Sequence, residues 1–121
     1  MQIQDRTLEY AIRAAKFVRK ISRDMAFDVL ARQLLRSATS IGANMREADS
    51  ASSKRDFINK VTISKKEAQE TEYWLEILRG AEFINNPDNT KELECLLSEC
   101  KEIIKVLAAI LHKAKKNPGN D

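Results

Sequence analysis

Apolar residues recur at intervals of three and four along four stretches of this chain, which is the spacing of one face of an α-helix. The most regular stripe lies in the second stretch and consists of Leu30, Leu34, Ala38, Ile41, Met45 and Ala48. Polar breaks separate the stretches, and Ser53 followed by Asp56 has the pattern of a helix-capping box. The spacing predicts four helices, at about residues 5–22, 27–48, 54–83 and 88–115.

Glycine and proline are scarce, with three and two in 121 residues. Folds rich in strands and loops need these turn residues far more often, so long helices with short connections are favoured. Four such helices predict an all-α fold, the up-down-up-down antiparallel four-helix bundle. We expect residues 1–116 to form this single domain and residues 117–121 to form a frayed tail. Gly42 interrupts the stripe of the second helix, which predicts that another backbone passes close to it.

The first and third helices carry more apolar surface than one core contact needs. The first has two stripes, one of Leu8, Ile12, Ala15 and Val18 and one of Tyr10, Ala14, Phe17 and Ile21. The third has a main stripe and a separate group of Ile63, Trp74 and Ile77. The excess indicates either a wide core contact or a surface for self-association. We favour the second, because Trp is enriched at interfaces, and predict an oligomer interface containing Phe17, Ile63, Trp74 and Ile77.

Composition excludes several classes of protein. Hydrophobic residues make up 43% and charged residues 32% of the chain, which is too apolar for a disordered protein. No stretch approaches the roughly 18 apolar residues of a membrane span, and the polar start lacks the apolar segment of a signal peptide. Cys95 and Cys100 lie about 140° apart around a helix and should not bridge. We expect a cytoplasmic protein with reduced cysteines.

The sequence has few residues that could form a catalytic or metal-binding site. His112 is the one histidine, and no CxxC, HExxH, GxSxG, P-loop or GxGxxG pattern is present. A nucleophile with its base and orienting group is therefore hard to assemble. The Glu-x-x-His pattern of di-iron bundles is also missing. We predict that the protein is not an enzyme and has no catalytic, cofactor-binding or metal-binding residues.

Polar residues follow the apolar stripes on two helices. They are Arg36, Ser40, Asn44 and Glu47 on the second, and Ser64, Glu67, Glu70 and Thr71 on the third. Such groups usually form hydrogen bonds or ion pairs between helices and fix their register. We predict pairs that join Arg36, and Lys65 or Lys66, to Glu47, Glu67 or Glu70.

Basic residues form a strip along the first helix, with Glu9 and Asp24 as the acidic residues nearby. The strip consists of Arg6, Arg13, Lys16, Lys20 and Arg23. Charged strips are usually solvated faces, but this one could also follow phosphates, above all if an oligomer repeats it. Lys113, Lys115 and Lys116 could extend it. Few aromatic residues are interleaved, so binding would depend on the nucleic-acid backbone rather than on base stacking.

One combination of residues resembles a known family. Ser40-Ile41-Gly42-Ala43-Asn44 and Glu47 are followed by Lys54-Arg55-Asp56-Phe57, and then by Glu67, Glu70, Thr71, Trp74 and Leu75. The combination is similar to that of the proteins encoded in intervening sequences of bacterial 23S ribosomal RNA genes, also called S23. Its characteristic positions here are Ser40, Asn44, Glu47, Glu67, Glu70 and Trp74. Many relatives have proline where this chain has Gly42.

The resemblance implies a four-helix bundle that assembles into a ring-shaped homopentamer. One branch of the family is associated with diversity-generating retroelements, where it partners a reverse transcriptase and contacts nucleic acid. Most members have no established activity. The resulting hypothesis is a non-enzymatic, homo-oligomeric accessory protein that binds RNA or DNA. The alternative is a scaffold that docks a partner protein on the surface around Phe17, Trp74 and Ile77.

Overall fold

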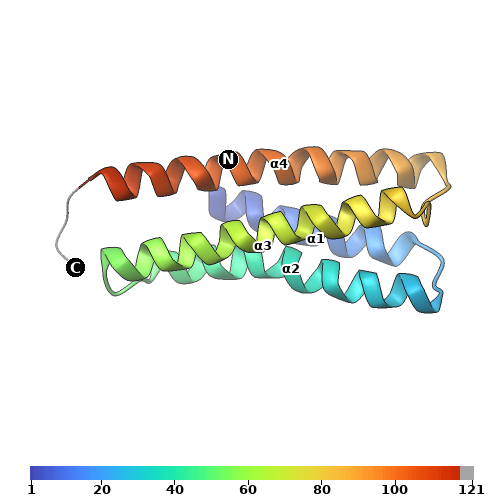
Figure 1. Ribbon diagram of the computed structural model, residues 1–121, viewed down its shortest axis with the longest axis horizontal. Coiled ribbons are helices and arrows are strands. Elements are labelled where there is room, and N and C mark those ends of the chain that lie inside the picture. Colours follow the sequence, from blue (N-terminus) through green and yellow to red (C-terminus); the bar gives the residue numbers. More distant parts are fainter. Residues whose placement is uncertain (118–121) are drawn as a thin grey trace.

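Four antiparallel helices make up the computed structural model, which describes residues 1–117 (Figure 1). They are α1 (Ile3–Lys20), α2 (Met25–Asp49), α3 (Lys54–Gly80) and α4 (Pro87–Lys116). The α1–α2 and α3–α4 connections lie at one end of the bundle and the α2–α3 connection at the other. The predicted all-α, up-down-up-down bundle is therefore confirmed. The predicted tail falls outside the described residues apart from Asn117, the C-cap of α4.

Local side chains fix most helix ends. Asp24 caps α2 by accepting a 2.7 Å hydrogen bond from the Phe27 amide, and Ser53 caps α3 by accepting one of 3.0 Å from the Asp56 amide. The prediction was wrong at the end of α3, which finishes at Gly80 rather than near residue 83. Glu82 takes a positive φ of 58°, which turns the chain away from the helical path.

The core lies between all four helices, because α1 and α3 each pack against both α2 and α4. One of the two α1 stripes enters it, and of the other stripe Val18 packs against it. Tyr10, Ala14 and Phe17 are buried, whereas Leu8 and Ile12 of the other stripe are 47% and 46% exposed. Phe17 is 1% exposed and so cannot contact a second copy. Its predicted place in an oligomer interface is corrected to a place in the core.

Within residues 1–117, four buried polar residues accompany the apolar core: Thr7, Ser37, Ser64 and Thr71. The Ser64 hydroxyl donates a 2.8 Å hydrogen bond to the Ile41 carbonyl, and the Ser37 and Thr71 hydroxyls are hydrogen-bonded at 2.8 Å. Both contacts join α2 to α3. Because buried polar groups are costly when unpaired, these contacts hold the two helices in one register.

Gly42 lies where α1 passes close to α2. A Cβ atom at this position would stand 3.3 Å from Thr7 Oγ1 and 3.4 Å from the Thr7 carbonyl carbon. The predicted close approach of a second backbone is therefore confirmed. A large side chain at residue 42 would have to push α1 away from the core.

We expect Gly42→Leu to lower the free energy of unfolding by about 1–3 kcal/mol, the usual cost of overpacking. Urea denaturation followed by circular dichroism measures the loss. Gly80→Leu is the matched control, because nothing lies within 4 Å of a Cβ at residue 80. The control should leave stability unchanged or raise it slightly through better helix propensity. Equal stabilities of the two variants would contradict the tight α1–α2 contact.

Candidate functional site

Arg36 is the centre of a polar cluster on the α2–α3 seam. Its guanidinium donates to Glu67 Oε2 at 3.2 Å and also to the carboxylate of Glu70. Trp74 Nε1 donates to the same Glu70 carboxylate at 3.4 Å. The hydrogen bond to Glu67 is the main reason that the pKa of Arg36 is raised. The predicted ion pairing of Arg36 with Glu67 and Glu70 is confirmed.

The other polar residues of this seam are arranged differently from the prediction. Ser40 Oγ and Asn44 Nδ2 donate to carbonyls of Arg36 and Ser40, so both bond within α2 and not to α3. Glu47 does reach α3, but its partner at 3.1 Å is Lys60. The prediction that Lys65 or Lys66 pairs with Glu47 was wrong, because Lys60 is the α3 lysine opposite the C-terminal end of α2.

Two arginines of the basic strip pair with carboxylates of α4. Arg6 donates to both oxygens of Glu99 at 2.6 and 2.8 Å, and Arg13 donates to Glu92 at 3.1 Å. Hydrogen bonding to Arg6 holds the pKa of Glu99 below its ordinary value. The sequence around the strip shows few acidic residues, but α4 supplies acidic partners for two of its arginines. The sequence did carry a signal for these pairs. The two arginines are seven residues apart, and so are the two glutamates. Antiparallel packing of α1 and α4 therefore aligns Arg6 with Glu99 and Arg13 with Glu92.

The rest of the strip keeps more of its charge available. Lys16 and Lys20 are exposed and form no ion pair within residues 1–117. Arg23 is 80% exposed and bonds the Asp28 carboxylate at 3.0 and 3.1 Å. The strip thus consists of two arginines tied to α4, two free lysines and one arginine shared with a nearby aspartate.

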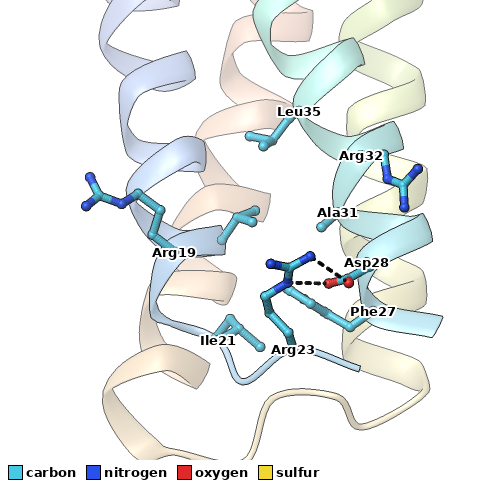
Figure 2. Close-up of a pocket in the computed structure, with 9 residues that line it drawn as sticks. Arg19, Ile21, Arg23, Phe27, Asp28, Ala31, Arg32 and Leu35 are labelled. Carbon is cyan, nitrogen blue, oxygen red and sulfur yellow. Dashed lines mark hydrogen bonds and ion pairs between the residues drawn. The ribbon is translucent and has the colours of Figure 1, made fainter. Parts of the chain in front are cut away.

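Two separate apolar hollows lie between α1 and α2. The first, of about 390 Å³, lies beside Leu8, Ala11, Gly42 and Ala43. The second, of about 410 Å³, lies at the end near the α1–α2 connection (Figure 2). We call it the arginine-rimmed hollow. Its lining is Val18, Arg19, Ile21, Arg23, Phe27, Asp28, Ala31, Arg32 and Leu35.

Figure 2 shows how charge surrounds this hollow. Arg23 and Asp28 meet across it, while Arg19 and Arg32 extend outward on either side. The inner surface is apolar, formed by such side chains as Val18 and Leu35. The arrangement suits an apolar group that carries negative charge at its edges.

A second apolar surface lies on α3, on the other side of α2. Tyr73 is 57% exposed, and its ring stands edge-on to Trp74 with centroids 5.2 Å apart. Ile63 and Ile77 are partly exposed, as is Trp74. We call Tyr73, Trp74 and Ile77 the Tyr73 strip. Three of the four predicted interface residues, Ile63, Trp74 and Ile77, therefore reach the surface.

The described residues include few reactive or metal-binding side chains. Burial raises the pKa of the Cys100 thiol to about 12, so that it stays protonated and unreactive at neutral pH. Cys95 is exposed, and neither cysteine is in a disulfide, as the spacing of the two predicted. Across residues 1–117, no three His, Cys, Asp or Glu side chains gather where they could hold a metal ion.

These features define a class of protein, the all-helical bundle whose polar residues set helix register and whose outer faces are available for contacts. The chain belongs to the family of 23S rRNA-intervening sequence proteins, whose model matches residues 1–109. It is similar to a crystal structure from Bacteroides thetaiotaomicron, described as a protein of unknown function from the S23 ribosomal protein family. That similarity has 42% identity and a TM-score of 0.79, over 91% of this chain and 98% of that one.

No curated protein matches the chain. Within the described part of the chain, each helix is too short or too polar to cross a membrane.

We expect the Arg6–Glu99 pair to stabilise the bundle only while Glu99 is ionised. The folded-state pKa of Glu99 is lowered, so the stability is present above the unfolded pKa and is lost as pH falls through the folded value. Thermal unfolding of Glu99→Gln and wild type should therefore differ at pH 7 and converge as the pH drops from about 5 to 2. A difference that persists at the lowest pH would show that the pair does not act through this charge.

Proposed function

We propose that this chain is a non-enzymatic, self-assembling bundle that binds nucleic acid as an accessory protein. The proposal depends on one observation: the outer surface of α1 has an apolar part and a basic part. Leu8 and Ile12 are about half exposed on the side toward α2, and Lys16 and Lys20 are exposed elsewhere on the same helix without ion pairs among residues 1–117. Apolar surface suited to assembly thus lies beside charge that assembly would repeat.

Assembly is needed for the electrostatic part of this proposal. The chain has a net charge of only +3, and Arg6 and Arg13 share their charge with α4 carboxylates. Two free lysines in a monomer would give a weak phosphate contact. A ring that repeats them would offer several contacts at once, and multivalent contacts add strongly to affinity.

The first test is the mass in solution, measured by light scattering on a sizing column. The resemblance to S23 proteins implies five copies, so we expect a mass near five times 13.8 kDa. Leu8→Glu should shift the mass toward that of a monomer, because it places charge in the exposed apolar stripe. Leu8 is 47% exposed, so the change should leave the fold of each bundle intact. A monomeric wild type would overturn the assembly proposal.

Binding is tested by titrating single-stranded and duplex RNA and DNA at several salt concentrations. We expect Lys16→Glu with Lys20→Glu to weaken binding about tenfold or more at low salt. The slope of log affinity against log salt should fall by about 1 for each phosphate that the variant no longer neutralises. Lys91→Glu with Lys101→Glu is the matched control, since both lysines are exposed on α4 and the charge change is equal. Equal weakening in both double variants, or no binding at low salt, would refute the proposal.

A second candidate function is a scaffold that docks a partner protein. The first hollow favours it, because Ala11, Gly42 and Ala43 leave room between α1 and α2. Small residues in such a groove allow a partner helix to approach closely. The solution mass separates the two functions, since a monomer would leave the first hollow open to a partner. In a stable ring, nucleic-acid binding remains the favoured function.

A further inference from the structure

A further hollow lies on the side of the bundle where α1 packs against α4. We call it the α1–α4 hollow; its volume is about 380 Å³, and its lining consists of Met1, Arg6, Glu9, Tyr10, Arg13 and Glu99. The side chains of Arg6 and Arg13 are 31% and 33% exposed. Tyr10 is buried, and its hydroxyl donates a 2.8 Å hydrogen bond to the Leu96 carbonyl. The hollow therefore presents two guanidinium groups to solvent above a floor that Tyr10 fixes.

Two carboxylates of α4 hold these guanidinium groups. Arg6 donates to both oxygens of Glu99 at 2.6 and 2.8 Å, and Arg13 donates to both oxygens of Glu92 at 3.1 and 3.5 Å. The Glu99 and Glu92 side chains are 23% and 32% exposed, so each can reach water if it leaves its arginine. Partly exposed pairs of this kind are weak. Because the planar fork of an arginine fits a phosphate as well as a carboxylate, a phosphate can take the place of either glutamate.

We propose that the α1–α4 hollow is a phosphate-binding site for the backbone of the bound nucleic acid, and that Glu92 and Glu99 compete with the phosphates for its arginines. The inference rests on the proposed nucleic-acid binding. It adds two arginines to the contact surface of α1 and makes two residues of α4 the groups that limit the affinity.

The positions of the arginines suit a nucleic-acid strand. Arg6, Arg13 and Lys20 are spaced by seven residues, so they recur on one side of α1 at intervals of about 10 Å. The rise per nucleotide along one strand of a duplex is about 3.4 Å. A strand that follows α1 therefore advances by about three nucleotides from one of these residues to the next.

The exposed lysines of the same helix favour the exchange of partners. A strand held at Lys16 and Lys20 keeps its next phosphates close to the two arginines, at a high effective concentration. A free anion has no such advantage over the glutamates. Glu9, which also lines the hollow, and Glu99, whose pKa is held low by its hydrogen bonds to Arg6, oppose the exchange. Since the two effects are balanced against each other, removing the carboxylate charges should raise the affinity.

Neutralising the two glutamates tests the site. Glu92→Gln with Glu99→Gln keeps the shape of both side chains, so the bundle should stay folded, which circular dichroism checks. The probes are single-stranded and duplex RNA and DNA, as for the α1 lysines. We expect the probe that wild type binds best to bind this variant about tenfold more tightly, or more, at low salt. The slope of log affinity against log salt should steepen by about 1 for each arginine that then neutralises a phosphate.

The matched control shows whether net charge alone explains the gain. Glu76→Gln with Glu94→Gln makes the same change in charge on exposed residues of α3 and α4, and it also frees Arg79 from its ion pair with Glu94. This variant should raise the affinity much less. An equal gain in the control would overturn the inference.

Replacing the arginines shows whether the gain arises in the hollow. Arg6→Gln and Arg13→Gln, added to the variant that lacks both glutamates, should abolish the gain and return the salt slope to that of wild type or below. A gain that survives without the two arginines would contradict the site.

Inorganic phosphate distinguishes a phosphate of a strand from a free one. Phosphate and chloride at equal ionic strength should displace the nucleic acid from the Glu92–Glu99 variant equally, since a free phosphate is not held by the lysines. Much stronger displacement by phosphate would assign the hollow to a free phosphate and overturn the backbone site. Binding by wild type with no gain in the variant would refute this inference alone. No binding by either protein would refute the proposed nucleic-acid binding together with the site.

Discussion

The contact of α2 with its two neighbours is the constraint on which the rest of the structure depends. On one side Gly42 lets α1 approach until Thr7 lies against the α2 backbone. On the other side Ser64 bonds to the Ile41 carbonyl and Thr71 bonds to Ser37. A helix that slipped by one turn would leave the buried Ser64 hydroxyl unpaired, at a cost of about 1–3 kcal/mol. Ser37 and Thr71 would lose their bond to each other but keep those to the Leu34 and Glu67 carbonyls of their own helices. Apolar burial alone would tolerate such a slip more easily.

This fixed register determines the surface charge. Once α2 and α3 are aligned, Arg36 stands opposite Glu67 and Glu70, and the antiparallel α4 brings Glu99 and Glu92 to Arg6 and Arg13. Partly exposed pairs of this kind contribute little stability, about 0–1 kcal/mol. Their larger effect is to decide which cations remain free. Lys16 and Lys20 are left without a partner in residues 1–117, and a phosphate contact on α1 would depend on them.

The same register determines which apolar residues remain outside the core. Tyr10, Ala14 and Phe17 fill the interior, and the core has no place for Leu8 and Ile12. On α3, Leu75 and Leu78 point inward while Tyr73 stays on the surface. Both surplus surfaces adjoin α2. A bundle that is complete as a monomer would have little reason to carry them, and this links the fold to the proposed assembly.

The sequence by itself determined the fold, the helix count and the family. Periodicity of three and four predicts helices whatever their neighbours, and residues such as Ser53 act within a few positions of the chain. It also predicted the pairing of Arg36 with Glu67 and Glu70, because these residues lie beside stripes that must face each other. Tertiary structure decided the rest. Whether Phe17 or Ile12 faces the core depends on where α2 and α4 stand. Whether Arg6 is free depends on Glu99, which is 93 residues away and becomes a neighbour only when α4 packs antiparallel to α1.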